Sequence, residues 1–479
     1  MQIAFLTLFL GLVTGPQAVT VDPGAGVAAL ELALDGRGVA RLEHAPWSAT
    51  VDFGPALLPH RLEARGLAAD GSEVARAEQW VNLPRPQAEV DIVLEGSAAG
   101  STRTARLTWE SFTRQAPSEL ELSLDGTPLA LDARAQAPLE IPRAGAAHVL
   151  SARLRFPDGV EARKDLVLSG DYGGDVATEL TAVAVRGAAP GKPAKTLAAR
   201  DLQGRFLAEG RPAEVAAVEQ EPAEVFVVRA AGAQSALLDR VMPGPAGAHS
   251  QPNMGASRAS ASLDGRAYGT FAPDPRIHLH FVSPVARIFK NGAATTAELF
   301  DITPSMTAPG LDLGRLLLQV RFRLPDHPRL ADAVASAGLD ALARETPRAV
   351  VFIAGGQDGA ADPSLFLPAA VRGYLDAIGV PLFVWSVGRP GRALAAWGDA
   401  QSIASPWELR RAYERLEREV LSQQIVWLQG RHLPQAITLA RGAGGAAGGY
   451  GARGGPADQL ELIAKPPAPA AAAPGHGRP

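Results

Sequence analysis

Short runs that alternate between apolar and polar residues fill the first third of the chain. Three of them are RLTW at 106–109, LELSL at 120–124 and HVLSARLRF at 148–156. Between 27 and 170 the runs are separated by the turn dipeptides Asp35-Gly36, Asp70-Gly71, Asp125-Gly126 and Asp158-Gly159. A period of two predicts half-buried strands, and strands spaced by such turns are typical of β-sandwich modules.

Two prolines divide this region. Pro84 and Pro86 stand in the segment NLPRP at 82–86, and few central strands tolerate proline because it cannot donate to the ladder. We therefore expect two immunoglobulin-like β-sandwich modules, the first over 19–87 and the second over 88–170.

Beyond Pro222 the pattern changes to buried strands followed by helices. The candidate strands are Val225–Val228, Ile277–Val282, Ala349–Ile353 and Val380–Val387. Two sets of apolar residues each fall on one helical face: Leu330, Val334, Ala337 and Ala341, and then Leu409, Ala412, Leu416 and Val420. This alternation predicts an α/β three-layer domain around a largely parallel sheet, which we place at 171–440 with lead-in strands.

Capping signals set the expected helix ends. Asp362 followed by Pro363 predicts a helix start, and Gly379 predicts the end of that helix. Ser405 with Glu408 predicts a capping box. Residues 243–275, rich in Pro, Gly, Ala and Ser, are expected to form a surface insertion, and 441–479 a low-complexity tail.

The N-terminal residues 1–18 have the pattern of a signal peptide, with an apolar run followed by Gly15, Pro16 and the small residue Ala18. The run is too short to span a bilayer, so the mature chain is expected to be exported without a membrane span. No Lys or Arg precedes the run, which leaves a buried N-terminal strand or a misassigned start as alternatives.

Composition excludes several classes of protein. The 479 residues carry a net charge of only −4, which does not favour a nucleic-acid surface. The absence of cysteine excludes disulfides, thiolate catalysis and cysteine-ligated metal sites.

The chain resembles bacterial von Willebrand factor A-related domain proteins, especially the exported group of acidobacterial type. The resemblance rests on LTAVAV at 180–185, on ARDLQGRFLAEGRPAEVAAVEQ at 199–220, and on 46–86, which is similar to the immunoglobulin-like modules preceding that domain. It implies a von Willebrand factor A-like α/β domain that begins at the next strand, with a divalent cation held by an Asp-x-Ser-x-Ser loop after that strand.

This chain departs from the family's metal motif. Positions 229–233 read Arg, Ala, Ala, Gly, Ala, and the turn that should hold a second aspartate reads Ala, Gly, Gly at 354–356. Asp358 comes too late to replace it. We therefore predict a degenerate metal site with no metal and no cofactor, and we single out Arg229 as a residue that offers a fixed positive charge to an acidic partner or pairs within the domain.

One other segment has the literal spacing of the metal loop. Asp301, Thr303 and Ser305 match it, but Pro304 and Pro309 disfavour the helix that should follow, so a capped turn is the simpler interpretation. His278 and His280 share one face of a strand without a third metal ligand of recognisable spacing.

No nucleophile elbow and no phosphate-binding Walker loop occurs in the sequence. We therefore expect a non-enzymatic, exported protein that binds an unidentified protein partner or scaffolds the envelope. Two alternatives stay open: a metal-dependent adhesion domain that uses the loop at 301–305, and an envelope enzyme with an unrecognised site.

Overall fold

The computed structural model describes residues 3–7, 9, 11–24, 26–84, 88–95, 103–111, 116–124, 126–139, 148–157, 160–168, 175–176, 180–187, 197–219, 222–230, 276–291, 293–303, 328–355, 362–440 and 460–465. The predicted insertion at 243–275, most of the predicted tail, Ser305 and Asp358 lie outside these ranges.

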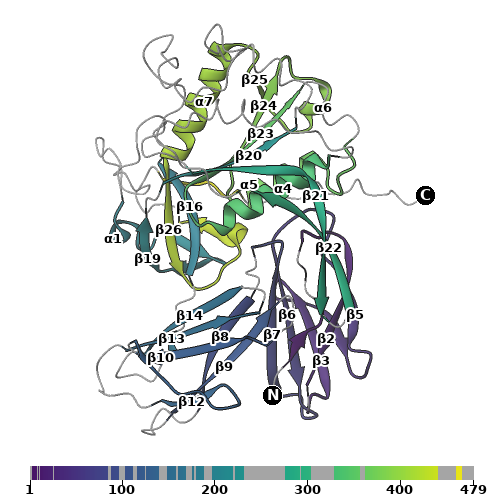
Figure 1. Cartoon of the computed structure of the whole chain (residues 1–479), viewed down its shortest axis with the longest axis vertical. Coiled ribbons are helices and arrows are strands. Elements are labelled where there is room, and N and C mark those ends of the chain that lie inside the picture. The colour runs from purple at the N-terminus through teal and green to yellow at the C-terminus, as the bar shows by residue number, and fades with distance from the viewer. Residues whose placement is uncertain are drawn as a thin grey trace, which may run out of the picture.

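The first unit is a β-sandwich of a three-stranded and a four-stranded sheet (Figure 1). One sheet contains β1 (Ala4–Phe5), β2 (Pro16–Asp22) and β5 (Ser48–Asp52); the other contains β4 (Arg37–Leu42), β3 (Ala29–Leu34), β6 (His60–Leu67) and β7 (Glu73–Val81). Alternate residues of both sheets, among them Val19, Leu30, Leu62 and Val81, form its core.

The residues predicted to be a signal peptide take part in this core. Ile3 and Phe5 are 4% and 6% exposed, and β1 pairs antiparallel with β2. At Gly66 a Cβ would lie 2.7 Å from Cδ1 of Ile3, so β6 requires a residue without a side chain there. This packing matches the alternative of a buried N-terminal strand, and export stays a prediction.

The second unit is also a β-sandwich, so the prediction of β-sandwich modules is confirmed. One sheet contains β12 (Gln136–Leu139), β9 (Arg103–Ser111) and β8 (Ala88–Glu95). The other contains β11 (Thr127–Pro128), β10 (Glu119–Leu124), β13 (His148–Arg155), β14 (Glu161–Leu168) and β15 (Asp175–Val176). The apolar positions of the period-two runs at 120–124 and 148–156, Leu122, Leu150 and Leu154, are buried between them.

A small β unit joins two distant parts of the chain. One of its sheets contains β19 (Val215–Glu219), β26 (Gln423–Gln429), β16 (Leu180–Gly187) and β28 (Leu460–Leu462). The other sheet contains β18 (Arg211–Ala213), β17 (Phe206–Ala208) and β27 (Ile437–Leu439). The short helix α1 (Ala199–Leu202) contributes the buried Leu202 to the core between the two sheets.

The remaining sheet has six strands. Their order is β22 (Ala293–Ile302), β21 (Arg276–Asn291), β20 (Glu224–Arg229), β23 (Arg348–Gly355), β24 (Leu382–Val387) and β25 (Ala400–Ser402). The pairs from β21 to β25 are parallel, and β22 is antiparallel to β21. The four apolar runs found in the sequence are β20, the start of β21, β23 and β24.

Helices cover both faces of this sheet. α4 (Leu330–Ala343) and α5 (Pro368–Ala377) pack on the face that contains Phe226 and Phe352, and α7 (Pro406–Leu421) packs on the face that contains Val225 and Trp385. All residues of the two predicted apolar helical faces are buried. A four-residue helix, α6 (Arg392–Ala395), lies between β24 and β25.

One predicted helix start is wrong. α5 begins at Pro368 after Leu367, six residues later than the cap predicted at Asp362, because the Asp362 carboxylate binds backbone N–H groups of α4 instead. The helix ends as predicted, since Gly379 adopts a positive φ of 68°. The N-cap of α7 is also as predicted, with Ser405 Oγ accepting from Glu408 N at 3.3 Å.

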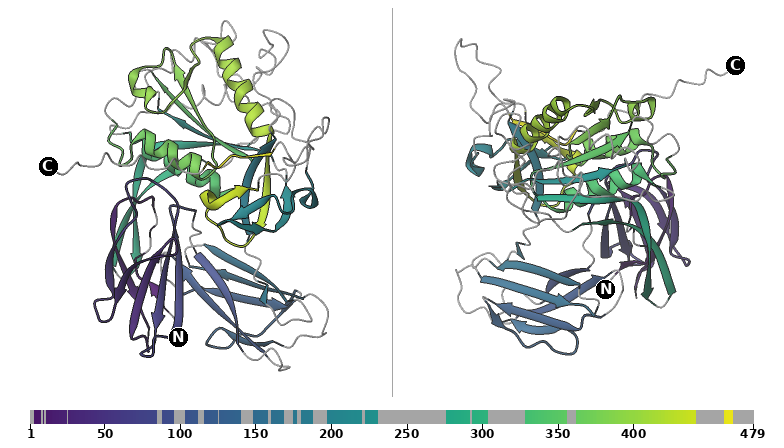
Figure 2. Two further views of the ribbon diagram at one scale, coloured as in Figure 1. Left: turned by 180° about the vertical axis from the view of Figure 1, so that it is seen from behind. Right: turned by 45° about the horizontal axis from the view of Figure 1, so that its top comes forward.

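The first sandwich packs directly against the α/β unit (Figure 2). Leu57, between β5 and β6, is 1% exposed and belongs to the same core as α4 and α5. The connection between β26 and β27, in the small β unit, also contacts this sandwich. The guanidinium of Arg431 lies 4.8 Å from the ring centroid of Trp80, and Gln435 Nε2 donates to Pro59 O at 2.7 Å. The first sandwich is therefore held by the core beneath α4 and α5 and by the small β unit.

Candidate functional site

The carboxyl ends of the parallel strands contain the point where the chain order reverses. β20 lies between β21 and β23, the next two parallel strands along the chain. The chain therefore proceeds from β20 to one side of the sheet and later crosses to the other side. In open α/β sheets ligands bind in the crevice at this point. Here β20 ends at Arg229, and the next residue, Ala230, donates its N–H to Ile353 O at 2.7 Å.

The described ends of β20 and β23 at this crevice carry no side-chain oxygen. Arg229 and Ala230 end one strand, and Ala354 and Gly355 end the other. Positions 231–233 and 356 lie outside the described residues. Among the residues that are described, no three His, Asp or Glu side chains gather as a metal-binding group.

Arg229 is 6% exposed, so its guanidinium lies inside the domain and not on its surface. The side chain of Arg229 therefore takes up space within the domain at the end of β20. A role for Arg229 in binding a partner stays a prediction.

The alternative metal loop at 301–305 does not lie at the carboxyl ends. Thr303 continues the pairing of the edge strand β22, because its N–H donates to Leu279 O at 2.9 Å and its hydroxyl accepts from Leu279 N at 2.9 Å. Leu279 is in the first half of β21. Asp301 and Thr303 therefore lie along the side of the sheet, and Ser305 is not described.

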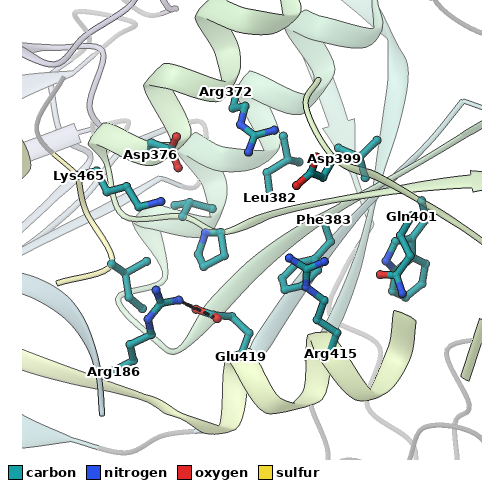
Figure 3. A pocket seen from close by; sticks show the side chains of 15 residues that line it. Arg186, Arg372, Asp376, Leu382, Phe383, Asp399, Gln401, Arg415, Glu419 and Lys465 are labelled. Carbon is teal, nitrogen blue, oxygen red and sulfur yellow. Dashed lines mark hydrogen bonds and ion pairs between the residues drawn. The ribbon is translucent and has the colours of Figure 1, made fainter. Parts of the chain in front are cut away.

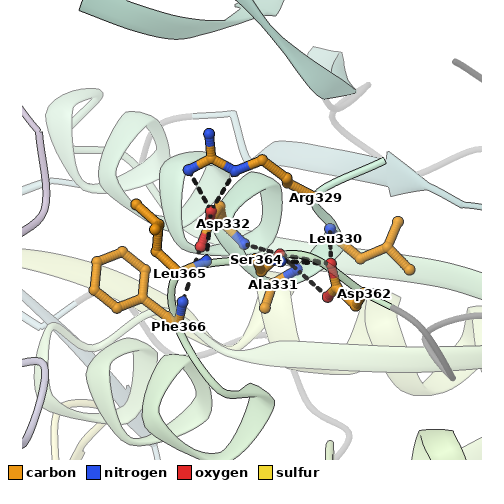
Figure 4. Close-up of polar contacts among 8 residues, drawn as sticks. All are labelled: Arg329, Leu330, Ala331, Asp332, Asp362, Ser364, Leu365 and Phe366. Atoms are coloured by element: carbon orange, nitrogen blue, oxygen red, sulfur yellow. Dashed lines mark hydrogen bonds and ion pairs between the residues drawn. The ribbon is translucent and has the colours of Figure 1, made fainter. Parts of the chain in front are cut away.

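Two aspartates and a serine, Asp332, Asp362 and Ser364, form a polar network at the start of α4 (Figure 4). The sequence pattern identified only Asp362 among them and assigned it to the start of a different helix. Asp362 Oδ1 accepts from Leu330 N and Oδ2 from Ala331 N, both at 3.0 Å. Ser364 Oγ accepts from Ala331 N at 3.0 Å and from Asp332 N at 3.2 Å. The first N–H groups of α4, which have no acceptor within the helix, are thus satisfied by a segment 31 to 32 residues later.

Asp332 completes the network in the opposite direction. Its two carboxylate oxygens accept from Leu365 N at 3.0 Å and Phe366 N at 3.1 Å. The same carboxylate, 4% exposed, is paired with Arg329, whose Nε lies 2.7 Å and whose Nη2 lies 2.6 Å away. We call these reciprocal bonds of Asp332, Asp362 and Ser364 the aspartate clamp.

The aspartate clamp lies at the carboxyl ends of the strands. Arg329, directly before α4, donates its backbone N–H to Val282 O, beyond the part of β21 that pairs with β20. Asp362 belongs to the connection that leaves the carboxyl end of β23. The network therefore occupies the end of the sheet where ligands bind in open α/β domains.

The clamp fixes a loop that exposes large apolar side chains. Leu365 is 77% exposed and Leu367 is 74% exposed, whereas Phe366 between them packs against the core beneath α4 and α5. Three hydrogen bonds hold the backbone of this loop: Leu365 N and Phe366 N donate to Asp332, and Ser364 N donates to Asp362. The hydroxyl of Ser364 also donates to Asp362 Oδ1. The two leucines are consequently presented on a fixed backbone.

The two histidines on β21 bind separate carboxylates near the amino ends of the strands. His278 Nε2 lies 2.8 Å from Glu224 Oε2 and its ring stacks on Phe226 at 4.7 Å, whereas His280 Nε2 lies 2.7 Å from Asp340 Oδ2. They therefore do not converge on one metal position. Burial alone would raise the pKa of Glu224, but the hydrogen bond and charge of His278, with Arg344 and Arg276, lower that pKa below 4.5.

No protein-family model and no curated protein matches this chain. Among solved structures, it is similar to the fibronectin(III)-like modules of Clostridium thermocellum CbhA, with 13% identity, coverage of 35% of this chain and 94% of that chain, and a TM-score of 0.15. It is also similar to the central fibronectin-III array of RIM-binding protein, with 10% identity, coverage of 42% of this chain and 82% of that chain, and a TM-score of 0.24. A β-glucuronidase from glycoside hydrolase family 2 matches with 10% identity, coverage of 41% of this chain and 27% of that chain, and a TM-score of 0.16.

The chain spans about a quarter of the length of that β-glucuronidase. At these TM-scores the similarities do not bear on what this chain does. Within the described residues, no helix has the length and apolar character needed to cross a membrane.

Proposed function

We propose that this chain is an exported, non-enzymatic protein-binding or scaffold protein, built on a von Willebrand factor A-like domain that binds its partner without a metal. A mixed sheet between two helical layers, with its one antiparallel strand at the edge of the described sheet, fits the domain that the sequence resemblance implies. Arg229 and Ala230 at the end of β20 fit the loss of the cation.

The observation that carries the proposal is the pair of exposed leucines held by the aspartate clamp. Partner-binding surfaces bury apolar side chains at their centre, and a surface that is already rigid loses less conformational entropy on binding. Leu365 and Leu367 meet both conditions, because they are 77% and 74% exposed on a backbone bonded to Asp332.

The experiment compares three full-length chains, immobilised and exposed to envelope proteins of the producing cell. The native chain is expected to retain a protein partner, and the double variant Leu365→Ser, Leu367→Ser is expected to bind that partner at least roughly tenfold more weakly, as for truncation of interface anchors. Val39→Ser removes a 40% exposed side chain on the first sandwich and serves as the matched control.

Equal retention by the native chain and the double variant would show that the clamped loop is not the binding surface. Equal loss by the double variant and Val39→Ser would mean that retention reflects general stickiness of the apolar surface. Asp332→Asn provides a further test, because it should loosen the loop and weaken binding while both leucines remain.

A further inference from the structure

A cavity of about 290 Å³ lies at the opposite end of the strands from the aspartate clamp (Figure 3). Its lining comes from β16, from α5, from the starts of β24 and β25, from α7, and from the residues that follow β28. Segments that are distant in the sequence thus build one hollow.

One wall of this cavity is a closed ion-pair network. Arg186 on β16 is bonded to Glu419 of α7 through Nη1 at 2.9 Å and to Glu461 of β28 through Nε at 3.2 Å. Its charge is therefore already compensated, and the network ties α7 to the small β unit.

The other charged side chains of the lining leave one positive charge in excess. Arg372 of α5, Arg415 of α7 and Lys465 after β28 are cationic, and Asp376 and Asp399 are anionic. None of these five side chains forms an ion pair in the described part of the chain. Figure 3 shows Arg372, Arg415 and Lys465 reaching toward the cavity from three different sides.

The floor of the cavity is a strand edge that β25 does not cover. β25 pairs only with Val384–Ser386, so no described strand pairs with the outer edge of β24 at Leu382 and Phe383. Both side chains are half-buried and line the cavity together with Pro381. The floor therefore combines apolar contact area with backbone groups of an unpaired strand edge.

We propose that this cavity binds a carboxylate attached to an apolar body. The carboxylate pairs with Arg415 and Lys465, with Arg372 close by, and the apolar body packs on Pro381 and Phe383. Asp376 and Asp399 favour a single negative charge, because a dianion such as phosphate is repelled by both.

Such a group comes from a free organic acid or from the carboxyl terminus of a peptide. The two sources differ in their amide: only a peptide carries an N–H and a C=O that can pair with the outer edge of β24. The test therefore uses benzoate, N-acetyl-phenylalanine and N-acetyl-phenylalaninamide, each titrated calorimetrically into the full chain.

We expect N-acetyl-phenylalanine or benzoate to bind with a stoichiometry of one, and the amide, which lacks a carboxylate, not to bind. Tighter binding of N-acetyl-phenylalanine assigns the cavity to peptide termini, and equal or tighter binding of benzoate assigns it to free acids. Absence of saturable binding by both acids, or equal binding of the amide, would refute the proposal.

Three variants locate the binding. Arg415→Met and Lys465→Met each remove an exposed cation and should weaken acid binding roughly tenfold, whereas Asp399→Asn removes a repelling charge and should strengthen it. Arg410→Met, in the exposed pair with Glu414 on the same helix, is the matched control and should bind as the native chain does. Acid binding that is unchanged in both Arg415→Met and Lys465→Met would place it elsewhere and overturn the assignment.

Discussion

The hydroxyl of Tyr374 in α5 donates a hydrogen bond of 2.8 Å to the backbone carbonyl oxygen of Asn82, at the end of the first sandwich. Tyr374 is 0% exposed and Asn82 is 4% exposed, so this bond between two units is formed away from water. Burial raises the pKa of Tyr374 well above its ordinary value, which keeps the hydroxyl protonated and available as a donor.

Removing this donor should weaken the attachment of the sandwich. Tyr374→Phe keeps the ring but leaves the buried carbonyl of Asn82 without that donor, and we expect the free energy of unfolding to fall by about 1–2 kcal/mol. Chemical denaturation of the full chain measures it. A variant as stable as the native chain would show that the hydroxyl contributes nothing to the contact.

The aspartate clamp should matter for stability as well as for binding. Asp332→Asn keeps the shape of the side chain but removes the charge that pairs with Arg329 and accepts two backbone N–H groups. We expect a loss of about 2–4 kcal/mol, because the substitution leaves the partly buried Arg329, 18% exposed, without its anion and weakens two backbone hydrogen bonds. The control is Glu408→Gln in the first turn of α7, which should lower the free energy of unfolding by less than about 1 kcal/mol. Equal losses of stability in Asp332→Asn and Glu408→Gln would contradict the role given to the aspartate clamp.

The pair of Glu224 and His278 predicts an acid-sensitive contribution to stability. The pKa of Glu224 is lower in the folded chain than its ordinary value of 4.5, so folding is favoured by its charged form. This contribution is complete above pH 4.5 and is lost as the pH falls through the folded pKa. Glu224→Gln should therefore be less stable than the native chain at neutral pH, and the difference should shrink below pH 4.5. A constant difference across that range, in denaturation followed by circular dichroism, would argue against this origin.

Titration with magnesium, manganese and calcium tests the proposed loss of the metal site. We expect no saturable heat in calorimetry, because the described strand ends carry Arg229, Ala230 and Gly355. Saturable binding that Asp301→Ala abolishes would instead support the loop at 301–305.

The N-terminal residues offer a test of export against burial. Phe5→Ala should destabilise the full-length chain by about 3 kcal/mol, because Phe5 is 6% exposed in the sandwich core. Leu6→Ala, at a 44% exposed neighbour, should change stability by less than about 0.5 kcal/mol. N-terminal sequencing of protein recovered outside the cell completes the test, since a chain that starts after Ala18 lacks β1 and cannot depend on Phe5.

The strands β20 and β23 were predictable because each contains a continuous apolar run, Val225–Val228 and Ala349–Ile353, whose burial on both faces leaves little choice of structure. The strands β22 and β25 contain no such run and were not predicted. The capping box at Ser405 was predictable for a similar reason: both partners lie within one turn. Asp362 has the same local signal, but its acceptor oxygens serve a helix that begins 32 residues earlier, at Leu330. Local patterns do not record such partners, and the aspartate clamp was missed for this reason.

The cavity beneath β24 could not be predicted because Arg372, Arg415 and Lys465 are unremarkable surface residues in the sequence. Only the folded chain brings them together, by placing α5, α7 and the segment after β28 around one strand edge. Arg229 illustrates a different limit, since the sequence singles it out at the end of a predicted strand but does not show that its side chain is buried.

The pairing of β16 with β26 has a consequence for biosynthesis. The hydroxyl of Thr181 donates to Gly430 O, 249 positions later, at the end of these two adjacent strands. While the ribosome is still translating the helices, both sandwiches are already complete, but β16 has no neighbouring strand. The small β unit thus closes late, and pairing between strands so far apart in the sequence implies slow folding of this unit.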